Sequence, residues 1–220
     1  MRSIMLCLGI LYFSLTTPVT SAYQAIYEAV TVPYELVTIV GDPNVQQSIL
    51  GELSGSPEMF EIVSDVPFVL SAEIRALQGG PEKLDFNGIV IRQKELRGVE
   101  EVARLKATDA EWSAIIEPAT GLLYRAGPFY SEEVPAGTYR IEVSTPENIG
   151  KYILVIGSIK NSTGYFASLA SVKTTYEFYG LSGFQMFSSP YVHYPIGIVL
   201  VLALLGGTWF WQRRRRRYHV

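Results

Sequence analysis

The chain has 220 residues, 48% of them hydrophobic and 18% charged, and its formal net charge at pH 7 is −3. Residues 23–190 hold all 21 acidic side chains but only 12 basic ones, a net charge of −9, and this acidic excess argues against nucleic acid binding. The composition also excludes intrinsic disorder, a collagen repeat and a disulfide scaffold.

The N-terminal segment has the order of a secretory signal peptide. Arg2 supplies a positive charge, residues 4–15 form a mostly apolar run, and small residues lead to Ala22. A run of 12 residues is too short to span a bilayer. We therefore predict a signal peptide over residues 1–22. Cleavage after Ser21 and an uncleaved membrane anchor are the alternatives.

Cysteine and histidine are scarce. The only cysteine, Cys7, lies in the predicted signal peptide, and the two histidines are His193 and His219. Residues 23–190 therefore lack the groups for a Ser-His-Asp triad, a Cys-His pair or a zinc or copper site built from His or Cys. The sequence predicts no cofactor there, and a fold held by its core without disulfides.

A period of two dominates residues 23–157. Short runs rich in Val, Ile, Tyr and Thr are separated by turn residues, and no alternation of strands with helices and no repeat is seen. This texture predicts a mainly β domain over residues 23–160, an antiparallel sandwich or barrel of eight to ten short strands. The clearest runs are residues 34–40, 67–74, 88–92, 111–116, 138–143 and 151–156.

Two adjacent strands carry a family resemblance. Residues 134–143 read VPAGTYRIEV and residues 148–155 read NIGKYILV. Gly137 permits a turn, after which Tyr139 and alternate residues share one face of the strand. The pair resembles the closing hairpin of bacterial pre-peptidase C-terminal-like domains, although Val155 stands one place early for that pattern. The resemblance implies a jelly-roll-like β-sandwich that serves as a non-catalytic accessory module of secreted and surface proteins.

The spacing of apolar residues changes from strand-like to helix-like after residue 157. Residues 161–163 are typical of a helix start, and we predict an amphipathic helix over residues 163–179, within a juxtamembrane segment of residues 161–190. Three alternatives are open for its apolar side: packing on the sandwich, the lipid interface, or another membrane protein. Asn161 begins a glycosylation sequon, which we expect to be unused because the family resemblance points to prokaryotes. The predicted apolar stripe is Phe166, Leu169, Val172, Tyr176 and Tyr179.

Residues 191–212 are long and apolar enough to cross a membrane as a helix. Tyrosines stand at one end and tryptophans at the other, as in the aromatic belts of membrane helices. The five arginines of residues 213–217 predict that residues 213–220 form a cytoplasmic tail. The sequence therefore predicts a single-pass protein of the cell membrane, with its N-terminal domain outside and the lipid bilayer as a partner.

Two features of this region have competing interpretations. Gly206 and Gly207 favour either close approach of another helix or simple flexibility. The arginines favour either binding of anionic lipid or a stop-transfer signal only. Removal of this segment after export, as in bacterial sorting signals, is a minor alternative.

Carboxylates are the main candidates left for catalysis or metal binding. The suggestive sets are Glu100 with Glu101, Glu132 with Glu133, and the loop of residues 85–88, in which Asp85 and Asn87 offer oxygens. Adjacent residues on a strand point to opposite faces, so neither glutamate pair forms a glycosidase dyad by itself. The loop lacks the spacing of an EF-hand. We assign no catalytic, cofactor-binding or metal-binding residue.

Three functional hypotheses follow. The first is a membrane-anchored, non-enzymatic binding module, and it predicts that residues 23–157 fold alone. The second is an accessory subunit of a membrane complex, contacting its protein partner through residues 163–211. The third is a carboxylate-dependent glycan hydrolase or a calcium lectin.

Overall fold

The structure, a computed structural model, describes residues 23–217 apart from residues 31, 81–82, 95–97 and 161–162. The predicted signal peptide and Asn161 lie outside the described residues. The described part contains eleven strands, two α-helices and two short 3₁₀ helices, η1 (Ala107–Asp109) and η2 (Gln185–Ser188). The strands are β1 (Ala25–Tyr27), β2 (Leu36–Thr38), β3 (Gln47–Ser54), β4 (Glu58–Ser64), β5 (Phe68–Leu77), β6 (Asn87–Gln93), β7 (Val99–Leu105), β8 (Ser113–Ile116), β9 (Leu123–Val134), β10 (Gly137–Ser144) and β11 (Ile149–Ile156).

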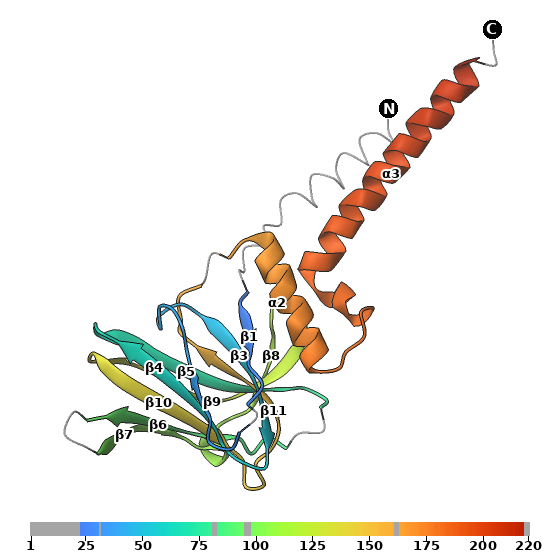
Figure 1. The fold of residues 1–220 in the computed structure, drawn as a ribbon. Coiled ribbons are helices and arrows are strands. Elements are labelled where there is room, and N and C mark those ends of the chain that lie inside the picture. The colour runs from blue at the N-terminus through green and yellow to red at the C-terminus, as the bar shows by residue number, and fades with distance from the viewer. Residues whose placement is uncertain (1–22, 31, 81–82, 95–97, 161–162, 218–220) are drawn as a thin grey trace.

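The strands form two packed sheets, which confirms the predicted β-sandwich (Figure 1). One sheet has the order β1-β3-β11-β5-β9-β8, and the other has the order β2-β4-β10-β6-β7. The expectation of eight to ten strands was too low, and the sandwich is not wholly antiparallel. The short strands β1 and β2 pair in parallel with β3 and β4. Parallel neighbours need a crossover, and the chain supplies one by running from β1 through β2 in the opposite sheet before it reaches β3.

The predicted hairpin between residues 134–143 and 148–155 is wrong in one respect. Both strands form, but β10 lies between β4 and β6 while β11 lies between β3 and β5 in the other sheet. The intervening turn crosses from one sheet to the other because both strands are central and each has two other partners. Tyr139 and Ile141 of β10 face Tyr152 and Leu154 of β11 inside the sandwich, so the predicted alternation is confirmed.

The interior between the sheets is the main core. Its side chains come from alternate positions of both sheets, as expected for strands with one face toward a partner sheet. Burial of each large apolar side chain stabilises the fold by about 1.5–3 kcal/mol. The residues exposed by less than 2% include Phe60, Ile62, Leu70, Ile74, Phe86, Tyr139, Ile141, Tyr152 and Leu154.

Helix α2 (Tyr165–Phe178) covers the outer face of the six-stranded sheet (Figure 1). Phe178 packs in a cluster with Leu50, Ile153 and Val155, so β11 is buried on both faces. The predicted helix is therefore confirmed, and its apolar side packs on the sandwich. Phe166 departs from the predicted stripe because its side chain is 82% exposed.

Helix α3 (Pro190–Arg217) is the one helix in the described residues that is long and apolar enough to cross a membrane. The candidate span covers residues 190–214, has a mean hydropathy of 1.7 and is not buried against the rest of the protein. This span contains the predicted residues 191–212.

Candidate functional site

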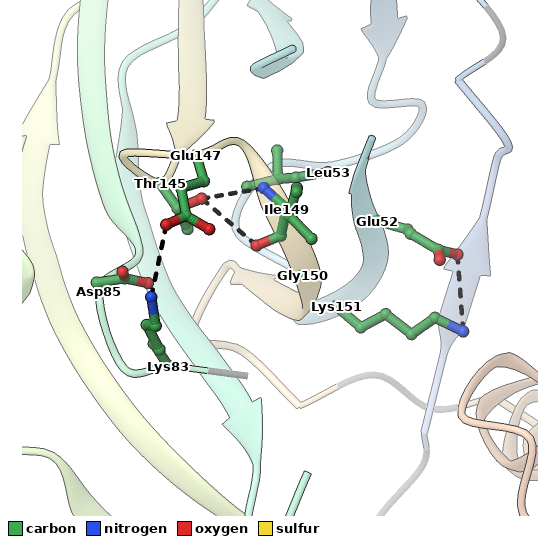
Figure 2. A pocket seen from close by; sticks show the side chains of 9 residues that line it. All are labelled: Glu52, Leu53, Lys83, Asp85, Thr145, Glu147, Ile149, Gly150 and Lys151. Carbon is green, nitrogen blue, oxygen red and sulfur yellow. Dashed lines mark hydrogen bonds and ion pairs between the residues drawn. The ribbon is translucent and has the colours of Figure 1, made fainter. Parts of the chain in front are cut away.

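A cavity with a volume of 310 Å³ lies at one end of the sandwich (Figure 2). Three chain segments that are distant in sequence form it: the end of β3, the approach to β6, and the turn that joins β10 to β11. In Figure 1 that turn lies at the lower edge of the sandwich, whereas α3 leaves from its upper side. The lining residues are Glu52, Leu53, Lys83, Asp85, Thr145, Glu147, Ile149, Gly150 and Lys151.

The turn between β10 and β11 is fixed by its own hydrogen bonds. The Oδ1 atom of Asn148 accepts a hydrogen bond of 3.3 Å from the backbone N–H of Thr145, and the Oγ1 atom of Thr145 accepts one of 3.1 Å from Ile149. Asn148 has a φ of 49°, a left-handed conformation that asparagine tolerates better than most residues. The backbone N–H of Gly55 also donates to the Asn148 carbonyl, which ties the turn to the end of β3. One wall of the cavity is therefore preformed.

The mouth of the cavity carries charges of both signs. Lys83 lies 3.6 Å from Glu147, and Lys151 lies 3.7 Å from Glu52 (Figure 2). The Lys83 and Glu147 side chains are more than 70% exposed, so their pairing contributes little to stability, about 0–1 kcal/mol. These side chains are therefore free to exchange partners for a charged or hydrogen-bonding ligand.

Lys151 also connects the cavity to α2. Its Nζ atom donates a 2.7 Å hydrogen bond to the carbonyl of Phe178 and lies 4.9 Å from the centre of that ring. A cation at the last turn of a helix interacts favourably with the carbonyl groups that are left unpaired there. Lys151 is thus held in place by the helix, whereas Lys83 is not.

A buried carboxyl lies directly behind Glu52. Glu58 Oε1 accepts a 3.3 Å hydrogen bond from the Glu52 backbone N–H, and its Oε2 accepts one of 2.5 Å from the Tyr152 hydroxyl. Burial raises the pKa of Glu58, and the two hydrogen bonds oppose that rise. Glu58 does not line the cavity, and its contacts tie the two sheets together.

A second cavity, of 190 Å³, contains an ion pair within the six-stranded sheet. Arg75 Nη1 lies 3.1 Å from Glu117 Oε2, and Arg75 Nε contacts Glu73. Burial raises the pKa of Glu117, while the charge of Arg75 lowers it. All three side chains are largely buried and satisfy one another, so this group stabilises the sheet. The spacing of Glu73 and Arg75 on one strand face was readable from sequence, but the approach of Glu117 was not.

The loop of residues 85–88 divides between cavity and core. Asp85 lines the first cavity, while Phe86 is fully buried. Asn87 donates from Nδ2 to the Asp85 carbonyl at 2.9 Å and accepts at Oδ1 from the Ala107 N–H at 3.0 Å. Both polar groups of the Asn87 side chain thus form hydrogen bonds with the backbone, and these bonds stabilise the loop.

The two glutamate pairs lie away from the cavity. Glu100 and Glu101 are on the exposed strand β7, where they pair with Lys94 at 3.4 Å and Arg104 at 2.7 Å. The other pair, residues 132–133, is exposed on β9. The two pairs belong to strands of different sheets, and neither pair lines the two cavities above. Within the described ranges, no group of three or more His, Cys, Asp or Glu residues is placed to hold a metal ion.

Comparisons with known proteins find matches among solved structures alone. No protein-family model matches the chain, and a comparison with curated proteins finds no match. Among solved structures, the chain is similar to the pre-peptidase C-terminal domain of a collagenase from Bacillus anthracis. That match has probability 1.00, a TM-score of 0.34 and 12% identity, and covers 58% of this chain and 97% of that one. This likeness assigns no residue role or activity to this chain.

Proposed function

We propose that this protein is a membrane-anchored, extracytoplasmic β-sandwich that binds a ligand in the 310 Å³ cavity without transforming it. The position of the cavity supports this most strongly. It lies at the lower edge of the sandwich in Figure 1, whereas α3 leaves from the upper side, so a protein anchored through α3 presents it away from the bilayer. The proposed ligand is polar, because the cavity offers two ammonium groups, three carboxylates and the Thr145 hydroxyl.

The proposed topology has the sandwich outside and the C-terminal tail in the cytoplasm of a cell-membrane protein. It is supported by the five consecutive arginines that follow the apolar helix and by the signal-like residues 1–22. A test is protease digestion of intact cells with a C-terminal epitope tag. A protected small tagged fragment is expected, and full protection of the sandwich would contradict the topology.

The accessory-subunit hypothesis is the second candidate, and the exposed side chains of α3 and of the side of α2 that faces away from the sandwich support it. The apolar side of α2 is packed on the sandwich, whereas side chains along α3, such as Leu202 and Leu204, are exposed. Replacement of residues 196–211 by an unrelated apolar anchor tests it. Loss of a co-purifying protein would support this candidate, and unchanged co-purification would count against it.

Binding is tested with the full-length protein in lipid nanodiscs on glycan and peptide arrays. Lys83→Glu reverses a charge at the mouth of the cavity, and Glu133→Lys is the matched control because Glu133 is exposed elsewhere, on β9. We expect a bound array member whose affinity falls about tenfold in Lys83→Glu and is unchanged in the control, equivalent to about 1.4 kcal/mol. Binding unaffected by Lys83→Glu, or cleavage of array members, would contradict the proposal.

A further inference from the structure

The sandwich and α3 are joined without a flexible linker. The Oγ atom of Ser189 donates a 2.6 Å hydrogen bond to the carbonyl of Ala119, and the hydroxyl of Tyr176 donates one of 2.9 Å to the carbonyl of Thr120. Both acceptors lie in the turn between β8 and β9. Ser189 immediately precedes α3, so the helix begins at a point that is bonded to the sheet.

A proline strengthens this connection. Pro195 lies inside α3 and has no N–H to donate to the carbonyl of Tyr191, four residues earlier. The hydroxyl of Tyr165, at the start of α2, donates a 2.6 Å hydrogen bond to that carbonyl. The first turn of α3 is therefore bonded to α2 as well as to the sheet.

The length of α3 sets the level of the bilayer surface. A helix rises about 1.5 Å per residue, so about 20 residues cross a hydrocarbon core about 30 Å thick. The first charged residue at the C-terminal end is Arg213. Counting back about 20 residues from it places the outer boundary of the hydrocarbon near His193. That boundary lies only a few residues beyond Ser189. The sandwich, which is bonded to Ser189, therefore lies next to the lipid headgroups.

Three exposed phenylalanines lie at this level. Phe166, Phe184 and Phe187 have side chains that are 82%, 86% and 47% exposed. The carbonyl of Phe187 is 3.2 Å from Nδ1 of His193, and Phe187 donates its N–H to the carbonyl of Phe184. Phe166 follows the tyrosine that is bonded to Tyr191. In Figure 1, the start of α2 and the segment before α3 both lie at the base of α3.

The two chain segments that carry these rings are uncharged. Residues 178–212 contain no Asp, Glu, Lys or Arg, and residues 163–172 contain none either. The body of the protein has a net charge of −9, so two uncharged segments with three exposed rings are unusual for it. Exposed apolar surface bordering a membrane span matches the interfacial region of a bilayer, where amphipathic segments bury their apolar faces about 5–10 Å deep.

We propose that Phe166, Phe184 and Phe187 form an aromatic collar that inserts into the outer headgroup region of the bilayer. The occupant of this surface is lipid. Together with the bonded start of α3, the collar fixes the orientation of the sandwich and directs the cavity away from the membrane. This inference rests on the proposed anchoring through α3 and adds a second membrane contact to it.

The experiment uses the full-length protein in phosphatidylcholine vesicles. Cys7 is the only native cysteine, so Cys7→Ser allows single cysteines to be labelled with an environment-sensitive fluorophore. The test positions are Phe166→Cys, Phe184→Cys and Phe187→Cys. Leu202→Cys in the middle of α3 reports anchoring, and Val40→Cys is the aqueous control because its side chain is 79% exposed on the sandwich.

We expect spin-labelled lipids to quench the collar positions about twofold or more above Val40→Cys, with the strongest effect from labels near the headgroups. Quenching of Leu202→Cys without quenching of the collar would overturn this inference and leave the anchoring intact. No quenching of Leu202→Cys would instead show that anchoring through α3 fails. Collar labels that are quenched by aqueous iodide in vesicles but shielded in native membranes would identify a protein partner, and would also overturn the lipid assignment.

Discussion

The hydroxyl of Tyr152 in β11 donates a 2.5 Å hydrogen bond to Oε2 of Glu58 in β4, and this contact joins the two sheets across the core. Tyr152 is fully buried and the Glu58 residue is 5% exposed. A buried carboxyl is costly when ionised unless it is paired, and among the described residues Glu58 has hydrogen-bond donors but no ion pair. The contact therefore affects how the stability of the fold depends on pH, and it limits the space around Gly51.

Stability is expected to fall as pH rises above 4.5. Burial raises the pKa of Glu58, so the folded state favours the protonated carboxyl. That contribution is fully present below the ordinary pKa of 4.5 and is lost as pH rises through the raised value, with a slope of up to about 1.4 kcal/mol per pH unit for one proton. Urea unfolding between pH 4 and pH 8 measures this slope. Glu58→Gln is expected to reduce this slope, with the remainder coming from Glu117, whose pKa is also raised by burial. A wild-type profile that rises with pH would contradict the assignment.

Gly51 is expected to tolerate no side chain. A Cβ at this position would lie 2.5 Å from Glu58 Oε2 and closer still to the Tyr152 ring. Both neighbours are buried, so Gly51→Ala forces them apart and lowers the free energy of unfolding by about 1–3 kcal/mol. Gly183→Ala is the matched control because nothing lies near its Cβ, and a change within about 0.5 kcal/mol is expected there. Equal unfolding midpoints for the two variants would refute this packing.

Removal of α2 is expected to abolish cooperative unfolding of the sandwich. Phe178 covers Leu50, Ile153 and Val155 on the outer face of the six-stranded sheet. Exposure of three such side chains costs about 5–9 kcal/mol, which is comparable to the whole stability of a typical domain. This prediction is opposite to the expectation that residues 23–157 fold alone, which follows from the sequence pattern. Thermal melts of fragments 23–157 and 23–189 decide this, and a sharp transition in the shorter fragment would show that α2 is dispensable.

The buried pair of Arg75 and Glu117 is expected to behave as a unit. Arg75→Met leaves the Glu117 carboxyl buried beside Glu73 without its cation, at a cost of about 3 kcal/mol. Adding Glu117→Gln removes the unpaired charge, so the double variant is expected to recover about 1–2 kcal/mol of that loss. Chemical unfolding of the wild type, both single variants and the double variant gives the coupling. Strictly additive effects would mean that the two residues do not interact.

Several strands were hidden from sequence patterns for specific reasons. Strand β3 is buried at almost every position and contains Gly51, so it shows no alternation and resembles a turn. Strand β7 is mostly exposed and carries a pair of glutamates, so it reads as a loop. Strands that are covered on both faces or on neither do not give the period of two that sequence reasoning depends on.

The sequence by itself determined the fold class, the helix before the span and the apolar helix that follows. It also determined that no disulfide forms within the chain, because Cys7 is the only cysteine. These properties depend on periodicity, composition and length, which can be read from residues that are neighbours in the sequence. Only the tertiary structure decided that β10 and β11 belong to opposite sheets, that Asp85 reaches the cavity, and that Glu117 pairs with Arg75. Those relationships join residues far apart in the chain, and they follow from how the two sheets and α2 bury their apolar faces together.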